Sequence, residues 1–145
     1  LDIDTLLKAA PADSDIFVCG PNGFINDVLK LSAQQGIDSA QLHREFFTAE
    51  PIDHSNDGSF EVEIASTGQV VSVGKDESML EALEDNGFFV PVSCEEGVCG
   101  TCITPLLGGE ADHKDVFLND KEKAQMDRVA VCCSRAKTPR LILDL

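Results

Sequence analysis

The fold is decided by the stretch Pro91-Val92-Ser93-Cys94-Glu95-Glu96-Gly97-Val98-Cys99-Gly100-Thr101-Cys102. Its three cysteines form a C-x4-C-x2-C array with glycines between them. A fourth cysteine, Cys132, follows after 29 intervening residues. Cysteines gathered on one loop indicate metal binding in a reducing compartment rather than disulfides in a secreted protein. We therefore expect the chain to fold around a metal centre.

Three thiolates on a loop and one at a distance are typical of a 2Fe-2S cluster of the plant ferredoxin type. Each of the two irons takes two thiolates besides the bridging sulfides, so four cysteines suffice. Gly97 and Gly100 suit this loop, because backbone wrapped around a cluster needs unusual dihedral angles and unobstructed amide N–H groups aimed at sulfur. The hydroxyls of Ser93 and Thr101 could add hydrogen bonds. The loop is thus predicted to hold a 2Fe-2S cluster.

Other uses of these cysteines agree less well with the spacing. A zinc site normally shows paired C-x2-C units, and here only Cys99 and Cys102 form one. A thioredoxin-like redox pair at those two residues would need a βαβ setting and would leave Cys94 unexplained. A Rieske centre needs histidine ligands, and none of these cysteines has a histidine two or three residues beyond it. His113 lies in an acidic loop, where we expect it at the surface.

The fourth ligand is ambiguous because Cys132 and Cys133 are adjacent. Residues 128–133 are predicted to form a strand, on which neighbouring side chains point to opposite faces. Only one of the two thiols could then reach the cluster. The residues alone leave the choice between them open.

The chain is strongly acidic. Its 145 residues include 26 Asp and Glu against 11 Lys and Arg, which gives a net charge of −15. Nucleic acid and anionic membranes would repel such a surface, so we expect neither as a partner, and a basic protein is the natural counterpart. No apolar run approaches the roughly 20 residues of a membrane helix, and we expect a cytoplasmic location. Because the first residue is Leu rather than Met, we expect a processed or excised piece.

The first 47 residues have the pattern of a partial α/β segment. Its predicted elements are a short helix over 4–10, a buried parallel strand over 15–19, a helix that starts at an Asn22 N-cap and ends at Gly36, and a strand over 41–47. Such a βαβ unit leaves a sheet face and an edge uncovered, so it cannot stand alone as a domain. Part of its domain is expected to be missing upstream.

A polar segment rich in turn-forming residues, 48–58, is predicted to be an interdomain linker. The domain that follows, 59–145, contains a helix with Ser78 and Glu81 in a capping-box relation. Its predicted elements are strands over 60–64 and 69–73, a helix over 75–86, an extended segment over 103–107, a helical turn over 120–125, and strands over 128–133 and 141–145. A hairpin, a helix across it and later strands describe a β-grasp domain, so the predicted fold class is α+β.

Two short motifs in the first segment, Val18-Cys19-Gly20-Pro21 and Glu45-Phe46-Phe47, resemble the end of the nucleotide-binding domain of the ferredoxin-NADP reductase superfamily. There a strand ends in Cys-Gly-Pro, a helix follows, and a terminal strand carries an acidic and an aromatic residue. The resemblance implies that Cys19, Gly20 and Pro21 border a nicotinamide pocket and that Phe47 packs against a flavin ring. It makes 1–47 the C-terminal remnant of an NAD(P)-binding reductase domain.

Residues 60–145 resemble the ferredoxin domain of the family of phthalate dioxygenase reductase and vanillate demethylase reductase. Besides the cysteine loop, the resemblance includes Gly109-Glu110-Ala111-Asp112-His113 and Ser134-Arg135-Ala136-Lys137. The whole domain order, with the Cys-Gly-Pro unit before the ferredoxin, is also similar to that family.

The family pattern implies a ligand set. Cys94 and Cys99 would bind one iron, and Cys102 with Cys132 would bind the other. Cys132 is chosen because the ligand in that family is the first residue of the corresponding pair. Cys133 would then be a packed free thiol.

The family also implies an electron chain. NADH would give a hydride to FMN, the flavin would pass electrons singly to the cluster, and the cluster would deliver them to a Rieske-type oxygenase for aromatic ring hydroxylation or O-demethylation. The implied partners are the flavin domain of the reductase and the oxygenase component.

The 145 residues contain no flavin-binding barrel and no glycine-rich first half of a nucleotide domain. FMN and NADH are therefore expected in the parent protein only, and the chain alone should be an electron carrier without NADH-oxidising activity. The alternative is a stand-alone ferredoxin or interaction module that assembles on a separate flavoprotein. Possible docking residues are Glu95, Glu96, Asp112, Lys114, Arg135 and Lys137.

Overall fold

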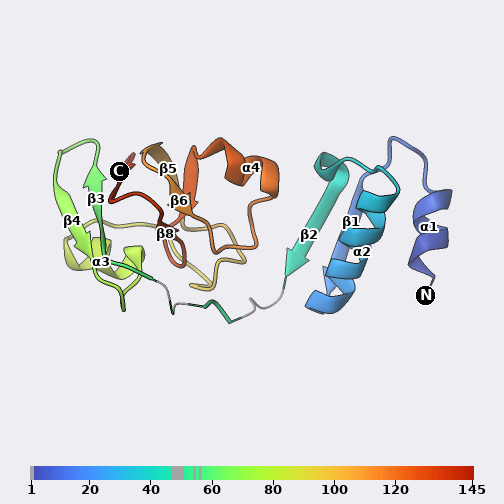
Figure 1. Cartoon of the computed structure of the whole chain (residues 1–145), viewed down its shortest axis with the longest axis horizontal. Helices are drawn as coiled ribbons and strands as arrows, with labels where there is room; N and C mark the ends of the chain where they lie inside the picture. Colours follow the sequence, from blue (N-terminus) through green and yellow to red (C-terminus); the bar gives the residue numbers. More distant parts are fainter. Residues whose placement is uncertain (1, 47–50, 54, 56) are drawn as a thin grey trace. The chain divides into compact units, whose positions relative to one another are not determined.

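The computed structural model describes residues 2–46, 51–53, 55 and 57–145. The chain divides into two compact units, Leu1–Thr48 and Ala49–Leu145 (Figure 1). Among the residues described, no helix has the length and apolar character needed to cross a membrane.

The first unit is built on two parallel strands that one helix connects. Its elements are α1 (Ile3–Ala9), β1 (Ile16–Gly20), α2 (Asn22–Gln34), the 3₁₀ turn η1 (Ser39–Gln41) and β2 (Leu42–Phe46). β1 pairs with β2 in parallel, from Ile16 beside Leu42 to Gly20 beside Phe46. The expected βαβ connection is therefore present.

Two details of this unit differ from the prediction. Pro21 is the N-cap of α2 and Asn22 is already helical, so the Asn22 side chain makes no cap hydrogen bond. β1 is not a fully buried strand, because Phe17 is 78% exposed while Val18 is buried. Successive side chains alternate between the sheet faces, and α2 packs on the Val18 face through Ile25 and Val28. The Phe17 ring instead stacks on His43 across the strand pair, with centroids 4.5 Å apart.

The second unit is a mixed sheet with a helix packed against it. Its elements are β3 (Phe60–Ile64), β4 (Val70–Val73), α3 (Met79–Asp85), β5 (Ile103–Gly108), β6 (Ala111–Asp112), α4 (Asp120–Gln125), β7 (Arg128–Ala130), β8 (Arg135–Ala136) and β9 (Arg140–Leu143). Five strands form one sheet in the order β4-β3-β9-β5-β7, and β6 pairs with β8. The β3–β9 pair is parallel and the other pairs are antiparallel. The α+β class predicted from the sequence is confirmed.

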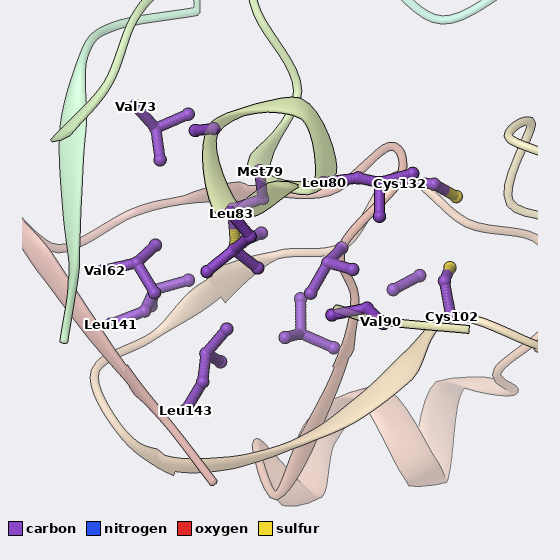
Figure 2. Packing of buried hydrophobic residues seen from close by; sticks show 14 of the residues in the cluster. Val62, Val73, Met79, Leu80, Leu83, Val90, Cys102, Cys132, Leu141 and Leu143 are labelled. Carbon is purple, nitrogen blue, oxygen red and sulfur yellow. The ribbon is translucent and has the colours of Figure 1, made fainter. Parts of the chain in front are cut away.

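The core of this unit lies between α3 and the sheet (Figure 2). Alternate residues of β3, including Val62, are buried. This burial agrees with the strict alternation of apolar and acidic residues over 60–64 in the sequence. Met79 and Leu83 of α3 are fully buried beside Leu141 and Leu143 of β9. Cys102 and Cys132 belong to the same apolar cluster, so the core and the cysteine site are continuous.

Helix α3 begins later than expected. The predicted helix over 75–86 starts at Met79, because the Ser78 hydroxyl accepts from the Glu81 amide while the Glu81 carboxylate accepts from the Ser78 amide. This capping box, predicted from the sequence, fixes the first turn. Gly87, at φ 82°, follows the end of the helix.

The strand predicted over 128–133 is also shorter than expected. β7 ends at Ala130, and residues 131–133 form a turn in which the Ser134 amide donates to the Ala130 carbonyl at 3.0 Å. The assumption that Cys132 and Cys133 alternate along a strand is therefore wrong.

Candidate metal centre

The cysteine loop, 91–102, connects α3 to β5 without forming a helix or a strand. Val90 before it and Cys102 at its end are each 2% exposed, so both ends of the loop are anchored in the core. Between them the loop follows an irregular path, within which Gly97 is buried and its carbonyl accepts from the Val116 amide at 3.1 Å.

Three loop residues adopt positive φ: Glu95 at 58°, Gly97 at 75° and Gly100 at 76°. A Cβ atom at Gly100 would lie 2.4 Å from the ring of Phe117, so a side chain there would clash as well as strain the backbone. Glu95 accepts the left-handed conformation despite its side chain, at a cost of roughly 1–2 kcal/mol. The sequence predicted unusual dihedral angles at the two glycines but not at Glu95, because glutamate has no preference for positive φ.

Cys94 and Cys99 form the outer pair of thiols. Cys99 is exposed and Cys94 is half-buried. The Glu96 amide donates to Cys94 Sγ at 3.4 Å, and the Thr101 amide donates to Cys99 Sγ at 3.5 Å. Hydrogen bonds from the Thr101 hydroxyl and amide, helped by Cys94, lower the pKa of Cys99 to about 6. This thiol is therefore readily available as the thiolate that metals bind.

Cys102 and Cys132 form the inner pair, and both are buried. Hydrogen bonding to Cys132, followed by burial, raises the pKa of Cys102 well above its ordinary value. The hydrogen bond from Cys102 acts to lower the pKa of Cys132. A hydrogen bond with Cys133 and burial of the thiol outweigh this effect and raise the pKa of Cys132 to about 12. The Gly97 amide also donates to Cys132. In the absence of a cation, the inner pair thus stays protonated.

The donor set fits a 2Fe-2S cluster. Among the described residues, no three His, Cys, Asp or Glu side chains converge on a single-ion position. The thiols instead meet as two pairs, and each iron of such a cluster takes two thiolates. Backbone N–H groups donate to both outer sulfurs, and backbone hydrogen bonds from Cys132 and Gly97 act to lower the pKa values of Cys102 and Cys132. The assignment of individual ligands remains a prediction.

Cys133 lies beside the inner pair. Its Sγ contacts the Ala130 carbonyl at 4.0 Å and the Ser134 hydroxyl at 3.9 Å. Because 131–133 is a turn, Cys132 and Cys133 both line one cavity of about 400 Å³. The two thiols therefore do not differ in which face of the chain they lie on. They differ in that Cys132 is hydrogen-bonded to Cys102.

His113 is buried, contrary to the expected surface position. Its side chain is 5% exposed, and Nδ1 lies 3.6 Å from Oδ1 of the fully buried Asp115. Burial lowers the pKa of His113, and the Asp115 carboxylate opposes this. The other Asp115 oxygen accepts from the Leu118 amide at 2.8 Å, which fixes the turn before α4. The acidic surroundings in the sequence gave no indication of this burial.

The side chains of two of the possible docking residues are largely covered by other parts of the chain. The side chain of Arg135 is 6% exposed and that of Lys114 is 13% exposed, so neither is free to meet a partner. Lys137, Glu95 and Glu96 are exposed. The prediction of a docking role is wrong for Arg135 and Lys114, because both side chains bind other parts of this chain.

The residues of the predicted nucleotide site lie in the first unit. Cys19 is exposed near the end of β1 and lines a small cavity of about 170 Å³ with Phe17, His43 and others. Gly20 has φ 151°, and a Cβ atom there would lie 3.3 Å from Phe24. Gly20 and Pro21 do not line that cavity. Phe47 lies outside the described residues, so its proposed flavin contact stays a prediction.

Known proteins are similar to this chain in sequence and in fold. The 2Fe-2S iron-sulfur cluster binding domain family matches residues 62–137. Vanillate O-demethylase oxidoreductase of Pseudomonas sp. (strain HR199 / DSM 7063) is 50% identical over 145 residues, which are 100% of this chain and 46% of that protein. The 3-chlorobenzoate-3,4-dioxygenase reductase subunit of Comamonas testosteroni is 40% identical over 100% of this chain and 44% of its own length. The chain thus spans less than half the length of these relatives.

Solved structures of related proteins are similar to this chain in fold. Phthalate dioxygenase reductase, described as a modular structure for electron transfer from pyridine nucleotides to [2Fe-2S], matches 100% of this chain and 44% of its own, with 34% identity and a TM-score of 0.70. The structure of Pseudomonas putida CBB5 NdmA with the ferredoxin domain of NdmD contains a chain that is 37% identical and 99% covered, with a TM-score of 0.58 over 60% of this chain. With more than half of its length matched by the family, this chain belongs to the 2Fe-2S iron-sulfur cluster binding domain family, and its cofactor is a 2Fe-2S cluster.

Proposed function

We propose that this chain is the C-terminal electron-transfer part of an NADH-dependent flavin reductase that supplies a Rieske-type oxygenase. In this proposal 1–47 is the end of the NAD(P)-binding domain, 48–58 is a linker and 59–145 is the ferredoxin domain. FMN and NADH would bind to the parent protein, and the oxygenase would carry out aromatic ring hydroxylation or O-demethylation. The names of the full-length relatives support this assignment.

The observation that carries the proposal is the difference in exposure between the two thiol pairs. Cys102 and Cys132 are buried in the core, whereas Cys94 and Cys99 reach the surface. When bound, a 2Fe-2S cluster takes up and releases one electron at a time. The inner thiols would anchor it to the fold, and the outer thiols would hold it where a partner can approach closely.

The amides of the loop would tune the site. The Glu96 and Thr101 N–H groups donate to the outer sulfurs. Donors aimed at thiolate sulfur stabilise its negative charge, so they favour uptake of an electron. The exposed carboxylates of Glu95 and Glu96 act in the opposite direction, since they add negative charge beside the loop.

The same carboxylates suit a basic partner. Glu95 and Glu96 are exposed, and the chain as a whole carries a net charge of −15. Complementary charge speeds the encounter between two proteins and weakens with salt. We propose that the oxygenase presents a basic surface to this loop, and that both proteins work in the cytoplasm.

Reconstitution with iron and sulfide tests the carrier role. The protein should become red-brown, and its visible bands should bleach when dithionite is added. Cys99→Ser should lose the colour, because one of two outer thiolates is removed. Cys19→Ser, which changes an exposed thiol in the other unit, is the matched control and should keep it. A colourless protein that holds one zinc ion would overturn the proposal.

A second experiment tests the partner. The chain reduced by dithionite, and then freed of it, is mixed with the oxygenase of a vanillate demethylase system. The visible bands of the chain should recover as it reduces the oxygenase. At low salt this recovery should be slower in the double variant Glu95→Gln/Glu96→Gln than in the unsubstituted chain. In 0.5 M salt the two proteins should recover at equal rates. NADH with a dye should show no turnover by the chain alone. Oxygenase reduction that is insensitive to both salt and the double substitution would contradict a basic docking surface.

A further inference from the structure

The turn over 131–133 carries Cys132 and lies between β7 and β8. Within it, the amides of Cys133 and Ser134 both donate to the Ala130 carbonyl, at 3.4 Å and 3.0 Å. These two bonds close the turn, but they do not determine where it lies against the rest of the fold. The position of the Cys132 thiol therefore depends on contacts with other elements.

The first turn of α3 holds the residue before Cys132. Amides in the first turn of a helix have no partner within the helix. In α3 the Leu80 amide donates instead to the Val131 carbonyl, at 3.0 Å. Leu80 and Cys132 also belong to one apolar cluster, in which they are labelled in Figure 2. One side of the Cys132 turn is thus bonded to the start of α3.

Arg135, three residues after Cys132, holds the other side of the turn. Its side chain is 6% exposed. Its guanidinium donates to the carbonyls of Glu77 at 2.5 Å, Gly74 at 2.7 Å and Gly58 at 2.8 Å. The first two carbonyls belong to the segment that leads into α3. Both sides of the turn are therefore bonded to the same part of the fold.

The charge of Arg135 is compensated where it lies. Its Nε is 3.6 Å from Oδ2 of Asp57, a side chain that is 5% exposed. The Lys114 ammonium donates to the same carboxylate. The guanidinium carbon lies 4.9 Å from the centroid of the Phe60 ring. A buried charge bound in this way resists displacement, because moving it leaves its partners uncompensated in a poorly solvated position.

The three carbonyl contacts need the shape of an arginine. A guanidinium presents five N–H donors in a planar, fixed fork, whereas a lysine ammonium is a compact charge on a flexible stem. The substitution Arg135→Lys would keep a cation near Asp57 and lose the simultaneous contacts with the three carbonyls. This single change therefore separates the charge of Arg135 from its geometry.

Arg135 also lies close to the predicted inner ligands. It lines one cavity of about 400 Å³ together with Cys132 and Cys133. Only two residues separate Arg135 from Cys132 along the chain, so a displacement of the first is transmitted to the second. Cys132 in turn is hydrogen-bonded to Cys102. The contacts of Arg135 thus bear on how the two inner thiols meet.

We propose that Arg135 is a positioning residue for the 2Fe-2S cluster, which fixes the Cys132 thiol beside Cys102 by tying the 131–133 turn to the start of α3. The proposal rests on the proposed function, in which Cys132 is an inner ligand of the cluster that carries the electron. Groups that orient a ligand without touching the metal tune the properties of the metal site. Arg135 acts on the cluster in this indirect way, through the sulfur of Cys132.

Electron paramagnetic resonance of the dithionite-reduced, cluster-loaded chain tests the proposal. In Arg135→Lys the g values should shift, because the Cys132 sulfur is no longer held in one position. Arg140→Lys is the matched control, since it makes the same change at an arginine whose side chain is 44% exposed, and it should leave the spectrum unchanged. Identical spectra for the two variants would overturn the proposal.

Hydrogen exchange read by mass spectrometry, on the same loaded proteins, separates a local effect from a general loss of stability. In Arg135→Lys the amides of a peptide covering 131–137 should exchange about tenfold faster, because charge-assisted hydrogen bonds that hold the turn are lost. A peptide covering β5, 103–108, should exchange at an unchanged rate. Equal acceleration of both peptides would overturn the proposal, since Arg135 would then support the fold as a whole.

Neither measurement involves the oxygenase. Loss of the cluster from Arg135→Lys, with unchanged exchange over 103–108, would also support the proposal. An unsubstituted chain that holds its cluster and does not reduce the oxygenase would contradict the proposed function alone, and the spectra and exchange rates would still decide the role of Arg135.

Discussion

The Sγ atom of Cys133 lies 2.6 Å from the position that a Cβ atom would take at Gly97. The Cα atom of Asp115 lies 3.0 Å from the same position, so backbone closes the other side. Gly97 is therefore enclosed by the turn that follows β7 and by the segment before α4. Three segments far apart in the sequence meet at this one glycine.

Gly97→Ala should prevent normal cluster loading. The methyl group would strain a backbone at φ 75° and would push on Cys133 and Asp115, with an expected loss of about 2–4 kcal/mol in the free energy of unfolding. Visible absorbance after reconstitution and a denaturant titration measure the two effects. Gly23→Ala is the control, since nothing lies within 4 Å of its added Cβ atom. Full loading of Gly97→Ala would contradict this account.

The two adjacent cysteines should respond differently to substitution. Cys132→Ser is expected to lose the visible bands, because Cys132 shares a hydrogen bond with Cys102 and accepts from the Gly97 amide. Cys133→Ser should keep the bands, with a loss of about 1 kcal/mol for placing a hydroxyl in a buried position. Iron and sulfide content per chain provides the measurement. If Cys133→Ser lost the cluster and Cys132→Ser kept it, the ligand assignment would have to be reversed.

Patterns within a few residues of sequence predicted the structural features that depend on residues adjacent in the chain. The alternation in β3 and the Ser78/Glu81 capping box are patterns within a few residues, and the structure confirms both. The two loop glycines were also predicted from local sequence, because glycine is the residue type that adopts unusual backbone dihedral angles most easily. The cysteine spacing predicted the cofactor, and the order of elements predicted the β-grasp fold. The family resemblance supplied the predicted set of individual ligands.

Features set by distant contacts were not predictable in this way. The turn at 131–133 depends on where β7 stops pairing with β5, which no residue type in that run reveals. Arg135 was taken for a surface cation because its three carbonyl partners lie about 60 to 80 residues away in sequence. The burial of His113 likewise results from packing between segments.

Ser78→Ala should shorten or loosen α3 and lower the free energy of unfolding by about 1 kcal/mol. The hydroxyl accepts from the Glu81 amide at 3.1 Å, and the carboxylate of Glu81 accepts from the Ser78 amide at 2.7 Å. Ser72→Ala, at an exposed position of β4, is the matched control and should change stability by less than about 0.5 kcal/mol. Equal denaturation midpoints for the two variants would show that the capping box contributes little.

The buried His113 should make the protein sensitive to mild acid. Burial holds its pKa below the ordinary value of 6.5, so the folded state favours the neutral ring. The unfolded chain then binds a proton first as pH falls, and stability should begin to drop near pH 6.5 and continue down to the pKa of the folded state. Three charged groups act on the ring: the Asp115 carboxylate favours protonation, whereas Lys123 and Lys137 oppose it.

His113→Gln removes the titrating ring and should flatten this dependence. Free energies of unfolding from denaturant titrations at pH 8, 7, 6 and 5, with equal cluster loading, compare the two proteins. The expected result is a curve for the unsubstituted chain that falls below pH 6.5, and a shallower curve for His113→Gln. Because Asp115 keeps its hydrogen bond to the Leu118 amide in either case, the difference between the curves reports on His113. Parallel curves would mean that other groups cause the acid sensitivity.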